Sequence, residues 1–380
     1  MTQYIIRRVL LMIPTLVGVS LLVTAFVRLL PGDAIDIILS NSEVQGASTE
    51  FKAMVDGELA SRDIDPTAAS FADRIAVENE FIDEQLRDQG VDPATATDAQ
   101  KQEARNTLSL NAYKDTLRSR IGLDKNYIEQ WWDWTGHALR GDLGESLTGR
   151  RSVASELNQR IPATVELGLV AMAVSLLIAL PIGVLSAVKQ DTWADYISRS
   201  TAIAMLALPS FFIATLTIAL SARWFGYSFP VFYKDFWEDP QTNFEIVIAP
   251  AIILGIGLSG TLLRLTRAQM LEVMRQDYMR TAQAKGLAGH AVVIRHGVRN
   301  AMIPVVTIIG LQVPVLIGGS LVLEQIFFIP GVSRYLFEAI QARDFPVIIA
   351  VNMVVALAII VVNLAVDLTY AWLDPRVTLA

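Results

Sequence analysis

The sequence predicts an all-α integral membrane protein. Hydrophobic residues make up 53% of the 380 positions and charged residues only 18%, and the mean hydropathy is +0.43; a soluble chain of this length carries more charge. The apolar residues gather in six runs, each long enough to cross a hydrocarbon core of about 30 Å as a helix. Lipid offers backbone groups no hydrogen-bond partners, and the runs lack the period-two alternation of barrel strands, so helices are expected. The runs are Val9–Val27, Leu167–Val188, Ser200–Ala222, Ile246–Leu263, Asn300–Leu323 and Phe345–Val366.

The first run is expected to stay in the protein as an uncleaved span. Arg7 and Arg8 precede it, as basic residues precede the apolar part of a signal peptide. The run is too long for a signal peptide, however, and no small-residue cleavage pattern follows it. Because short loops rich in Lys and Arg stay on the cytoplasmic side, the two arginines place the N-terminus inside. The segment 29–162 then lies outside.

The later loops agree with one topology, in which both termini are cytoplasmic. The loop with Lys189 and Arg199 is expected inside, and the aromatic-rich loop 223–245 is typical of the outer membrane interface. Six spans return the C-terminus, with Arg376, to the cytoplasm. The loop 264–299 gives the strongest cytoplasmic signal, since only Glu272 and Asp277 oppose its basic residues Arg264, Arg267, Arg275, Arg280, Lys285, Arg295 and Arg299.

A polar segment separates the first span from the other five. Between Asn41 and Gln130 it holds 18 acidic and 10 basic residues. Phe71–Arg87 is expected to be helical, with a turn soon after it at Gly90–Pro93. The Trp-rich stretch Tyr127–Leu139 is expected to lie at the lipid headgroups or to pack against the protein's outer face. The expected domains are an N-terminal transmembrane helix (1–30), an extracytoplasmic segment (31–160) with an acidic insertion at 41–120, a five-helix transmembrane domain (161–371) and a cytoplasmic tail (372–380).

The sequence contains no pattern that predicts catalysis, metal binding or ATP binding. It has no cysteine, its three histidines are not spaced as helical metal ligands, and it has no G-x-x-x-x-G-K-[ST] phosphate loop. Ion-coupled carriers place ionisable residues near the membrane midplane, whereas Glu166 and Asp367 lie close to span ends. A membrane-anchored sensor would leave the basic loop 264–299 without a purpose. We therefore favour a transporter whose free energy comes from another subunit.

The basic loop contains a candidate for contact with such a subunit. It reads R-T-A-Q-A-K-G-L-A-G-H from Arg280 to His290, and its small residues followed by glycines predict a short helix that ends near Gly286. Such a helix fits a groove on a partner protein. The alternative is a solvated basic loop that attracts anionic lipid. Spacing alone favours neither.

Prolines and glycines inside the runs predict kinks and close helix contacts. A proline removes a backbone donor, and a glycine lets two helices approach closely. Helix packing, rather than substrate contact, is the expected role of most of them. The prolines are Pro209, Pro250, Pro304 and Pro314, and the glycines are Gly255, Gly257, Gly310, Gly318 and Gly319.

Short motifs of one family occur along nearly the whole chain outside 41–120. The longest lies within Met270–Thr307 and contains M-L-E-V-M-R-Q-D-Y-M-R-T-A-Q-A-K-G-L. The others are Y-I-I-R-R-V-L-L-M-I-P-T-L-V-G-V-S near the N-terminus, P-G-D at Pro31–Asp33, G-D-L-G-E-S at Gly141–Ser146, P-A-T-V-E-L-G at Pro162–Gly168, E-Q-I-F-F-I-P-G-V-S-R at Glu324–Arg334 and D-P-R at Asp374–Arg376. Their order and coverage resemble the binding-protein-dependent ABC permeases. More narrowly, the chain resembles the first permease subunit of the dipeptide, oligopeptide and nickel importers, with a type-1 ABC transmembrane domain.

The resemblance implies a multi-pass permease of the prokaryotic cytoplasmic membrane that works with three kinds of partner. A homologous second permease would share the pathway, two ATP-binding subunits would lie below it, and an extracytoplasmic substrate-binding protein would lie above it. ATP and Mg²⁺ would be bound by the ATP-binding subunits, so no cofactor is expected in this chain. Peptides are the expected substrates, with nickel, glutathione, oligosaccharide or another small solute as alternatives within the family.

The resemblance also implies two sites. The helix that couples to the ATPase corresponds to Arg280, Thr281, Ala282, Ala284, Lys285, Gly286 and Leu287, with Gly286 allowing the turn after it. Many relatives in the wider superfamily have Glu in place of Arg280, so the charge partner of Arg280 is left open. The second site is a short helix that dips at the outer gate, near Glu324, Pro330, Gly331 and Arg334; a plain outer loop with solvated Glu324 and Arg334 is the alternative.

The acidic insertion at 41–120 lies outside this resemblance. We expect it to form a small helical subdomain that faces the binding protein, with a solvated, disordered spacer as the alternative.

Overall fold

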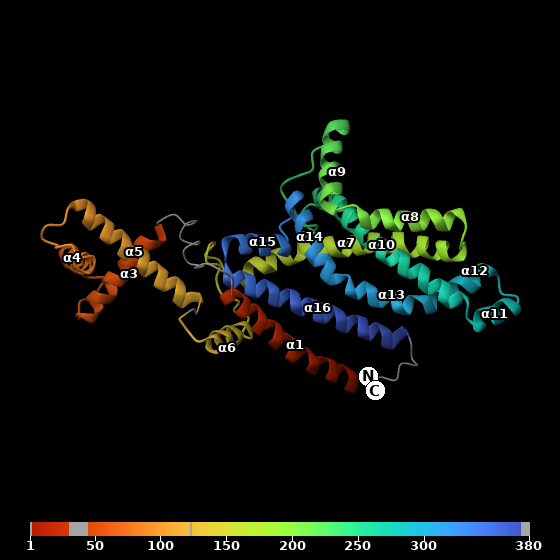
Figure 1. The fold of residues 1–380 in the computed structure, drawn as a ribbon, viewed down its shortest axis with the longest axis horizontal. Helices are drawn as coiled ribbons and strands as arrows, with labels where there is room; N and C mark the ends of the chain where they lie inside the picture. The colour runs from red at the N-terminus through yellow and green to blue at the C-terminus, as the bar shows by residue number, and fades with distance from the viewer. Residues whose placement is uncertain (1, 30–44, 122–123, 374–380) are drawn as a thin grey trace. The chain divides into compact units, whose positions relative to one another are not determined.

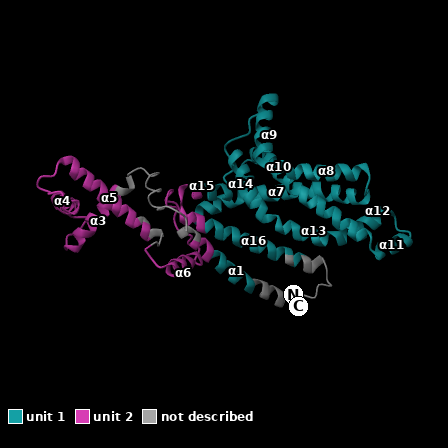
Figure 2. Cartoon of the chain, in the orientation of Figure 1, with its two compact units in different colours: residues 1–20, 154–338, 350–380 teal, residues 21–153, 339–349 magenta. Residues whose placement is uncertain are grey.

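The protein, for which we use a computed structural model, is described over residues 2–29, 45–121 and 124–373. Within these ranges the regular secondary structure is helical, with one isolated bridge between Glu145 and Ser152. The predicted all-α fold is thus confirmed. The chain divides into two compact units (Figure 2). The P-G-D motif at 31–33 and the D-P-R motif at 374–376 lie outside the described residues.

Unit 1 comprises residues 1–20, 154–338 and 350–380 and holds the predicted membrane domain (Figures 1 and 2). The helix α10 is central to it, because α8, α9, α13 and α14 all contact α10. The helices are α7 (Val153–Val188), α8 (Trp193–Ala207), α9 (Ser210–Phe225), α10 (Pro240–Met274), α11 (Asp277–Ala284), α12 (Gly289–Ala291), the π-helix η1 (Val292–Val298), α13 (Arg299–Leu311) and α14 (Val313–Ile326), with parts of α1 (Thr2–Leu29), α15 (Val332–Ala342) and α16 (Phe345–Leu373).

Among the described residues, four helical stretches are long and apolar enough to cross a membrane. They are α7, α10, the stretch Gly289–Leu311 and the first 22 residues of α16, Phe345–Val366. The pair α8 and α9 would make a fifth if the two helices form one bent span, and Leu10–Ala25 of α1 is a shorter apolar stretch. Each of the six predicted apolar runs therefore lies in helix. The structure does not fix how many of these helices cross the membrane, so the count of six spans remains a prediction.

The third predicted run is bent at the proline where a kink was expected. α8 and α9 meet at an angle of 90° on either side of Leu208 and Pro209. Leu208 has an extended backbone, with φ −89° and ψ 120°, as expected for a residue that precedes proline. Pro209 has no N–H to continue the helix. The proline identified in the sequence is thus the physical reason that the run Ser200–Ala222 is divided between two helices.

The fifth run also differs from its predicted form. It is divided at Gln312 into α13 and α14, with Pro314 in the first turn of α14. A proline is well suited to a first helical turn, where its missing N–H would have no partner in the helix. Pro250 and Pro304, in contrast, lie inside α10 and α13 without ending either helix.

The segment 264–299 was predicted to be a loop and is mostly helical. α10 continues through Arg264 to Met274, and two residues later α11 begins. The apolar run ends at Leu263, but the residues that follow it favour helix, so the helix outlasts its apolar part. Hydropathy marks where a helix becomes polar and not where it ends, so the connection between these two predicted spans contains more helix than the one short helix that was expected within it.

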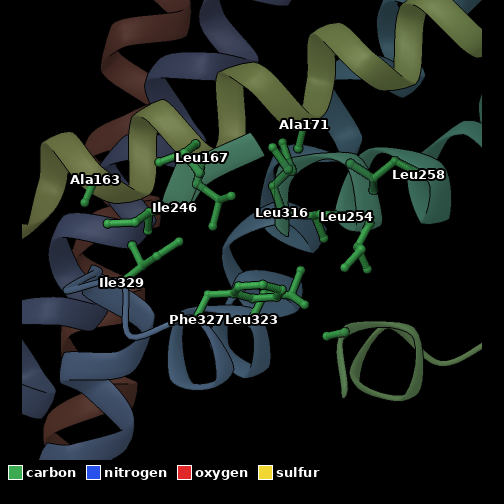
Figure 3. Packing of buried hydrophobic residues seen from close by; sticks show 14 residues of the cluster. Ala163, Leu167, Ala171, Ile246, Leu254, Leu258, Leu316, Leu323, Phe327 and Ile329 are labelled. Atoms are coloured by element: carbon green, nitrogen blue, oxygen red, sulfur yellow. The ribbon is translucent and has the colours of Figure 1, made fainter. Parts of the chain in front are cut away.

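The core of unit 1 lies where α7, α10 and α14 pack together (Figure 3). Its buried residues include Leu167 and Ala171 of α7, Ile246, Leu254 and Leu258 of α10, Leu316 and Leu323 of α14, and Phe327 and Ile329 just after α14. A Cβ on Gly255 would lie 2.6 Å from the carbonyl oxygen of Ala171, so α7 and α10 touch through their backbones there. Close approach is likewise found at Gly310 and Gly319, while a Cβ on Gly257 or Gly318 would have no described atom within 4 Å, so these two glycines do not serve this purpose.

Unit 2, comprising residues 21–153 and 339–349, contains the acidic insertion. The helices α3 (Gln45–Ser61), α4 (Phe71–Asp88) and α5 (Asp98–Ile121) contact one another. Their buried residues are Phe51, Val55, Leu59, Val77, Ile82, Leu86 and Ala104. α4 begins at a capping box, in which Ser70 and Asp73 bond each other's backbone N–H. The described part of the insertion is therefore a small helical bundle with its own core, and the disordered alternative is wrong for these residues.

Candidate functional site

The short helix α11 is anchored by two side chains on one of its faces. Met279 and Ala282 are buried, three residues apart, and they pack with Val292 of η1 against Val273 and Met274 at the end of α10. Residues at this spacing share one face of a helix. A Cβ on Gly297 would lie 3.2 Å from Met270 and 3.6 Å from Met279, so η1 also packs closely against this corner. α11 is thus fixed to the ends of two long helices.

The opposite face of α11 is exposed. Arg280 has 78% of its side chain exposed, and its contact with Asp277 is a long 3.9 Å ion pair. An exposed pair of this kind contributes little stability. Lys285, Gly286 and Leu287 follow as an exposed turn, in which Gly286 N–H donates to the carbonyl of Gln283. No described residue covers this face, so another protein can contact it.

The predicted coupling segment is therefore only partly helical. α11 contains Arg280, Thr281, Ala282 and Ala284, whereas Lys285 caps the helix and Gly286 and Leu287 lie beyond it. The helix is shifted by three residues from the expected Arg280–Leu287, because Gly286 has φ +77°. L-residues rarely adopt this left-handed region, and glycine adopts it readily. Gly289, the next glycine along the segment, begins α12.

A buried ion pair that the sequence did not reveal joins three helical segments near α11. Arg267 of α10 donates to both carboxylate oxygens of Asp195 in α8, each at 2.7 Å. Ser186 of α7 donates a third hydrogen bond to Asp195, and the backbone N–H of Asp191 a fourth. Asp195 is fully buried. Arg267, which contributed to the predicted basic loop, is thus a structural residue that holds α7, α8 and α10 together.

Glu324, predicted near an outer gate, is fully buried in α14. Its carboxylate accepts hydrogen bonds from Thr164 Oγ1 at 3.1 Å, Ser320 Oγ at 3.0 Å and the backbone N–H of Arg334 at 2.8 Å. The Thr164 hydroxyl also accepts from the backbone N–H of Val332 at 2.8 Å. The alternative of a solvated Glu324 is therefore wrong, because α7, α14 and α15 enclose this side chain.

This arrangement caps the start of α15 with a side chain from another helix. The residue before α15 is Gly331, which has no side chain to satisfy the first N–H groups. Glu324 and Thr164 accept from them instead, and a carboxylate at a helix N-terminus is also favoured by the helix dipole. The Arg334 side chain turns away and pairs with Glu338 at 2.8 Å. Pro330 and Gly331 thus form the turn that brings α15 onto Glu324.

Glu166, which lies close to an end of a predicted span, is partly buried and hydrogen-bonded within unit 1. It accepts from Tyr233 Oη at 2.9 Å and from Asn243 Nδ2 at 3.1 Å. Burial, together with the hydrogen bond to Glu166, raises the pKa of the Tyr233 phenol above its usual value. Thr164 and Glu166 belong to the same sequence motif, so Pro162–Gly168 supplies two polar anchors from one helix. The sequence analysis did not identify this role for either residue; two polar residues inside an otherwise apolar helix are the signal that could have pointed to them.

The motif G-D-L-G-E-S at Gly141–Ser146 is anchored by a side-chain hydrogen bond within unit 2. Ser146, the last residue of G-D-L-G-E-S, donates to Asp344 at 2.6 Å, and Thr148 Oγ1 donates to the same oxygen at 3.0 Å. Asp344 directly precedes α16. The motif therefore fixes the polar segment to the start of the last helix. Across the described residues, no three His, Asp or Glu side chains gather closely enough to hold a metal ion.

The long apolar helices among the described residues are those of a multi-pass membrane protein. Residues 179–379 match the family described as "Binding-protein-dependent transport system inner membrane component". The glutathione transport system permease protein GsiC of Escherichia coli O6:H1 (strain CFT073) is 32% identical over 377 residues, 99% of each chain, and that of Escherichia coli K12 matches to the same extent. The chain belongs to the binding-protein-dependent ABC permease family.

One solved structure, titled "Crystal structure of an amino acid ABC transporter with histidines", is also similar. It covers 57% of this chain and 94% of its own, with 14% sequence identity and a TM-score of 0.44. Members of the family work as membrane subunits together with other permease, ATP-binding and substrate-binding subunits.

Proposed function

We propose that this chain is one of two homologous permeases that form the pathway of a small-peptide importer, and that separate ATP-binding subunits drive it through α11. The observation that carries the peptide assignment is the end-to-end similarity to permeases named for glutathione, which is itself a tripeptide. The observation that carries the role of α11 is its construction, with one face anchored and the other exposed.

The geometry of α11 supports its use as a lever. Two residues, Arg275 and Gln276, separate it from α10, so the connection is too short to absorb a large displacement. Met279 and Ala282 bind it to α10 and η1 by packing, and close-packed interiors transmit strain. A partner that moves the exposed face therefore moves the central helix of unit 1. A subunit that binds the inward-open and outward-open states of the pathway with different affinity can therefore shift the equilibrium between them.

The free energy of transport is assigned to the partners. The chain lacks a phosphate-binding loop motif. Asp195, the buried carboxylate of α8, is held by Arg267, and Glu324 by three donors. Carboxylates already held in this way are better suited to fixing helices than to binding and releasing a coupling ion at each cycle. A binding protein would then select the substrate outside the membrane.

Proteoliposomes test this function directly. The chain is reconstituted with its homologous permease, its ATP-binding subunits and its binding protein, with ATP inside, and the uptake of labelled glutathione, dipeptides and tripeptides is measured. We expect uptake that requires both ATP and the binding protein. Uptake that follows an imposed ion gradient without ATP would contradict the proposal. Uptake of nickel in place of every peptide would overturn its substrate class alone.

The exposed face of α11 offers a separate test with a matched control. Arg280→Glu reverses a charge that is exposed and hardly paired, so it should leave the fold intact and weaken capture of the ATP-binding subunits. Arg295→Glu makes the same reversal at an exposed position of η1, outside α11. Capture by tagged permease should fall for the first variant and not for the second. Equal capture of the ATP-binding subunits by both variants would show that α11 is not the docking helix.

A further inference from the structure

The Trp-rich helix α6 (Tyr127–Ala138) of unit 2 exposes a row of large apolar side chains. Ile128, Trp132 and Leu139 are 62%, 70% and 85% exposed. Their spacing places all three on one side of the helix and its cap. Gln130, on the other side, is buried. A helix with an exposed row of this kind in aqueous solution would be unfavourable, and interfacial helices of membrane proteins have this character.

The position of α6 along two predicted spans agrees with a membrane surface. Tyr127 donates from its hydroxyl to the backbone carbonyl of Leu21, which lies in the predicted span Val9–Val27. A cavity of ≈ 210 Å³ next to α6 is lined by Thr24 of the same span and by Phe345 and Ile349 of the predicted last span. All these residues belong to unit 2. α6 therefore lies where two membrane-crossing helices reach their predicted outer ends.

The polar lining of this cavity carries charges of both signs. Lys125 donates to Asp133 at 2.5 Å, and this pair lines both the cavity and a second one of ≈ 460 Å³, which adds Ile128, Glu129 and Trp132. The hydrogen bond raises the pKa of Lys125 and lowers that of Asp133, so both stay charged at neutral pH. The indole N–H of Trp134, which also lines the first cavity, is buried and has no hydrogen-bond partner among the described residues.

The balance of these charges selects the kind of lipid. Among the described residues that line the two cavities, the carboxylates of Asp133, Asp142 and Glu129 outnumber the ammonium group of Lys125. An excess of carboxylates repels a lipid with net negative charge. A headgroup with a phosphate for Lys125 and a primary ammonium for the carboxylates matches the lining, since charge-assisted hydrogen bonds are the stronger ones. Phosphatidylcholine carries a phosphate but has no N–H to donate.

We infer that the α6 face is a binding site for a phosphatidylethanolamine molecule of the outer leaflet. The headgroup lies against Lys125, Asp133 and Asp142, and the acyl chains run beside the apolar row of α6 and the first turn of α16. This site fixes the polar segment between the first two spans at the membrane surface. The inference uses the predicted topology and does not depend on which substrate the protein transports.

Lipid retention by the intact transporter tests the site. The complex is purified from nanodiscs made of phosphatidylethanolamine and phosphatidylglycerol, or of phosphatidylcholine and phosphatidylglycerol, and the bound lipids are counted by native mass spectrometry. The double variant Lys125→Gln, Asp133→Asn should retain about tenfold less phosphatidylethanolamine, because it removes both charge-assisted contacts. The matched control is Arg62→Gln, which breaks a comparable exposed pair with Glu58 and Glu80 in the insertion.

Two results would overturn the inference. One is equal phosphatidylethanolamine retention in the double variant and in the control; the other is retention of phosphatidylcholine as strong as that of phosphatidylethanolamine. A second measurement uses lipid brominated on its acyl chains, which should quench the wild-type tryptophan fluorescence more than that of Trp132→Phe. No difference between the two, with Trp132 shielded only when the binding protein is added, would assign the face to a protein partner instead.

Discussion

The carboxylate of Glu324 fills the space in which Gly331 would carry a side chain. A Cβ on Gly331 would lie 2.2 Å from Glu324 Cδ and 2.3 Å from Glu324 Oε2, closer than real Cβ atoms approach any atom. The pair explains why a proline–glycine turn precedes α15. Glycine admits the buried acid, and the acid supplies the cap that glycine lacks. The two residues form one structural unit, although seven positions separate them.

Gly331→Ala should therefore destabilise the protein. The added methyl group must displace a buried carboxylate that has three hydrogen bonds, and overpacking of this kind costs about 1–3 kcal/mol. Gly318→Ala in α14 is the matched control, because nothing lies within 4 Å of its Cβ position. There, replacing a helical glycine should stabilise by about 0.5–1 kcal/mol. Thermal unfolding in detergent measures both; a Gly331→Ala midpoint equal to the wild-type value would refute the clash.

Thr164 and Glu324 should be energetically coupled. Thr164→Val removes a hydroxyl that donates to Glu324 and accepts from Val332. Glu324→Gln keeps the size but turns one acceptor into a donor, which faces either Arg334 N–H or the hydroxyls. Each change should cost about 1–3 kcal/mol. In a double-mutant cycle on the unfolding free energy we expect a coupling of about 0.5–3 kcal/mol, whereas additive single changes would show that the contact is not formed.

Sequence patterns located the helices better than their ends and bends. The apolar runs found α7, α10 and α16 because burial in lipid demands about 20 apolar residues. They did not find the polar continuation of α10 through Arg264, since a helix needs backbone hydrogen bonds and not apolar side chains. Pro209 marked the break in the third run, but the 90° angle of that break depends on tertiary packing, which local sequence does not contain.

In the candidate sites too, local features were predicted from the sequence, whereas contacts between distant residues were not. A glycine after a short helix was predicted from spacing, and Gly286 does adopt a positive φ. Glu324 was expected on the outer side, but its burial depends on Thr164, 160 residues earlier in the chain. Asp195 and Arg267 are separated by 72 residues, and Arg267 was considered only as one of the basic residues of the segment 264–299, so their pairing was not predicted. Contacts between residues that are far apart in the sequence can be identified only once the three-dimensional structure is known.

Breaking the pair of Asp195 and Arg267 should be among the most damaging single changes in unit 1. Asp195→Asn leaves Arg267 without its carboxylate, and Arg267→Met leaves the buried Asp195 with only the longer 3.6 Å ion pair to Arg199. Removing one partner of a buried ion pair costs about 3–5 kcal/mol. Arg199→Gln is the control, because its Nε lies 3.6 Å from Asp195, beyond a hydrogen bond. Thermal unfolding and the yield of folded protein measure the effect.

The double variant Asp195→Asn, Arg267→Met separates charge from packing. If the loss in the single variants comes from an unpaired buried charge, replacing both residues should recover part of the stability. If the loss of unfolding free energy in the double variant equals the sum of the losses in the two single variants, the two residues act independently. That result would refute the statement that their ion pair holds α8 and α10 together.

Gly286 provides the sharpest test of α11, because its neighbourhood is open and only its backbone is unusual. Nothing lies within 4 Å of its Cβ position, yet its φ is +77°. Valine is β-branched and pays about 1–2 kcal/mol in this region, whereas asparagine tolerates it. We expect Gly286→Val to shift the end of α11 and uncouple ATP hydrolysis from transport, while insertion into the membrane continues. Gly286→Asn should keep both activities. Reconstituted complexes with substrate-loaded binding protein measure the two together: normal substrate-stimulated ATP turnover in Gly286→Val would exclude the proposed coupling role, and equal losses in both variants would show that side-chain size, and not the left-handed turn, is what the partner requires.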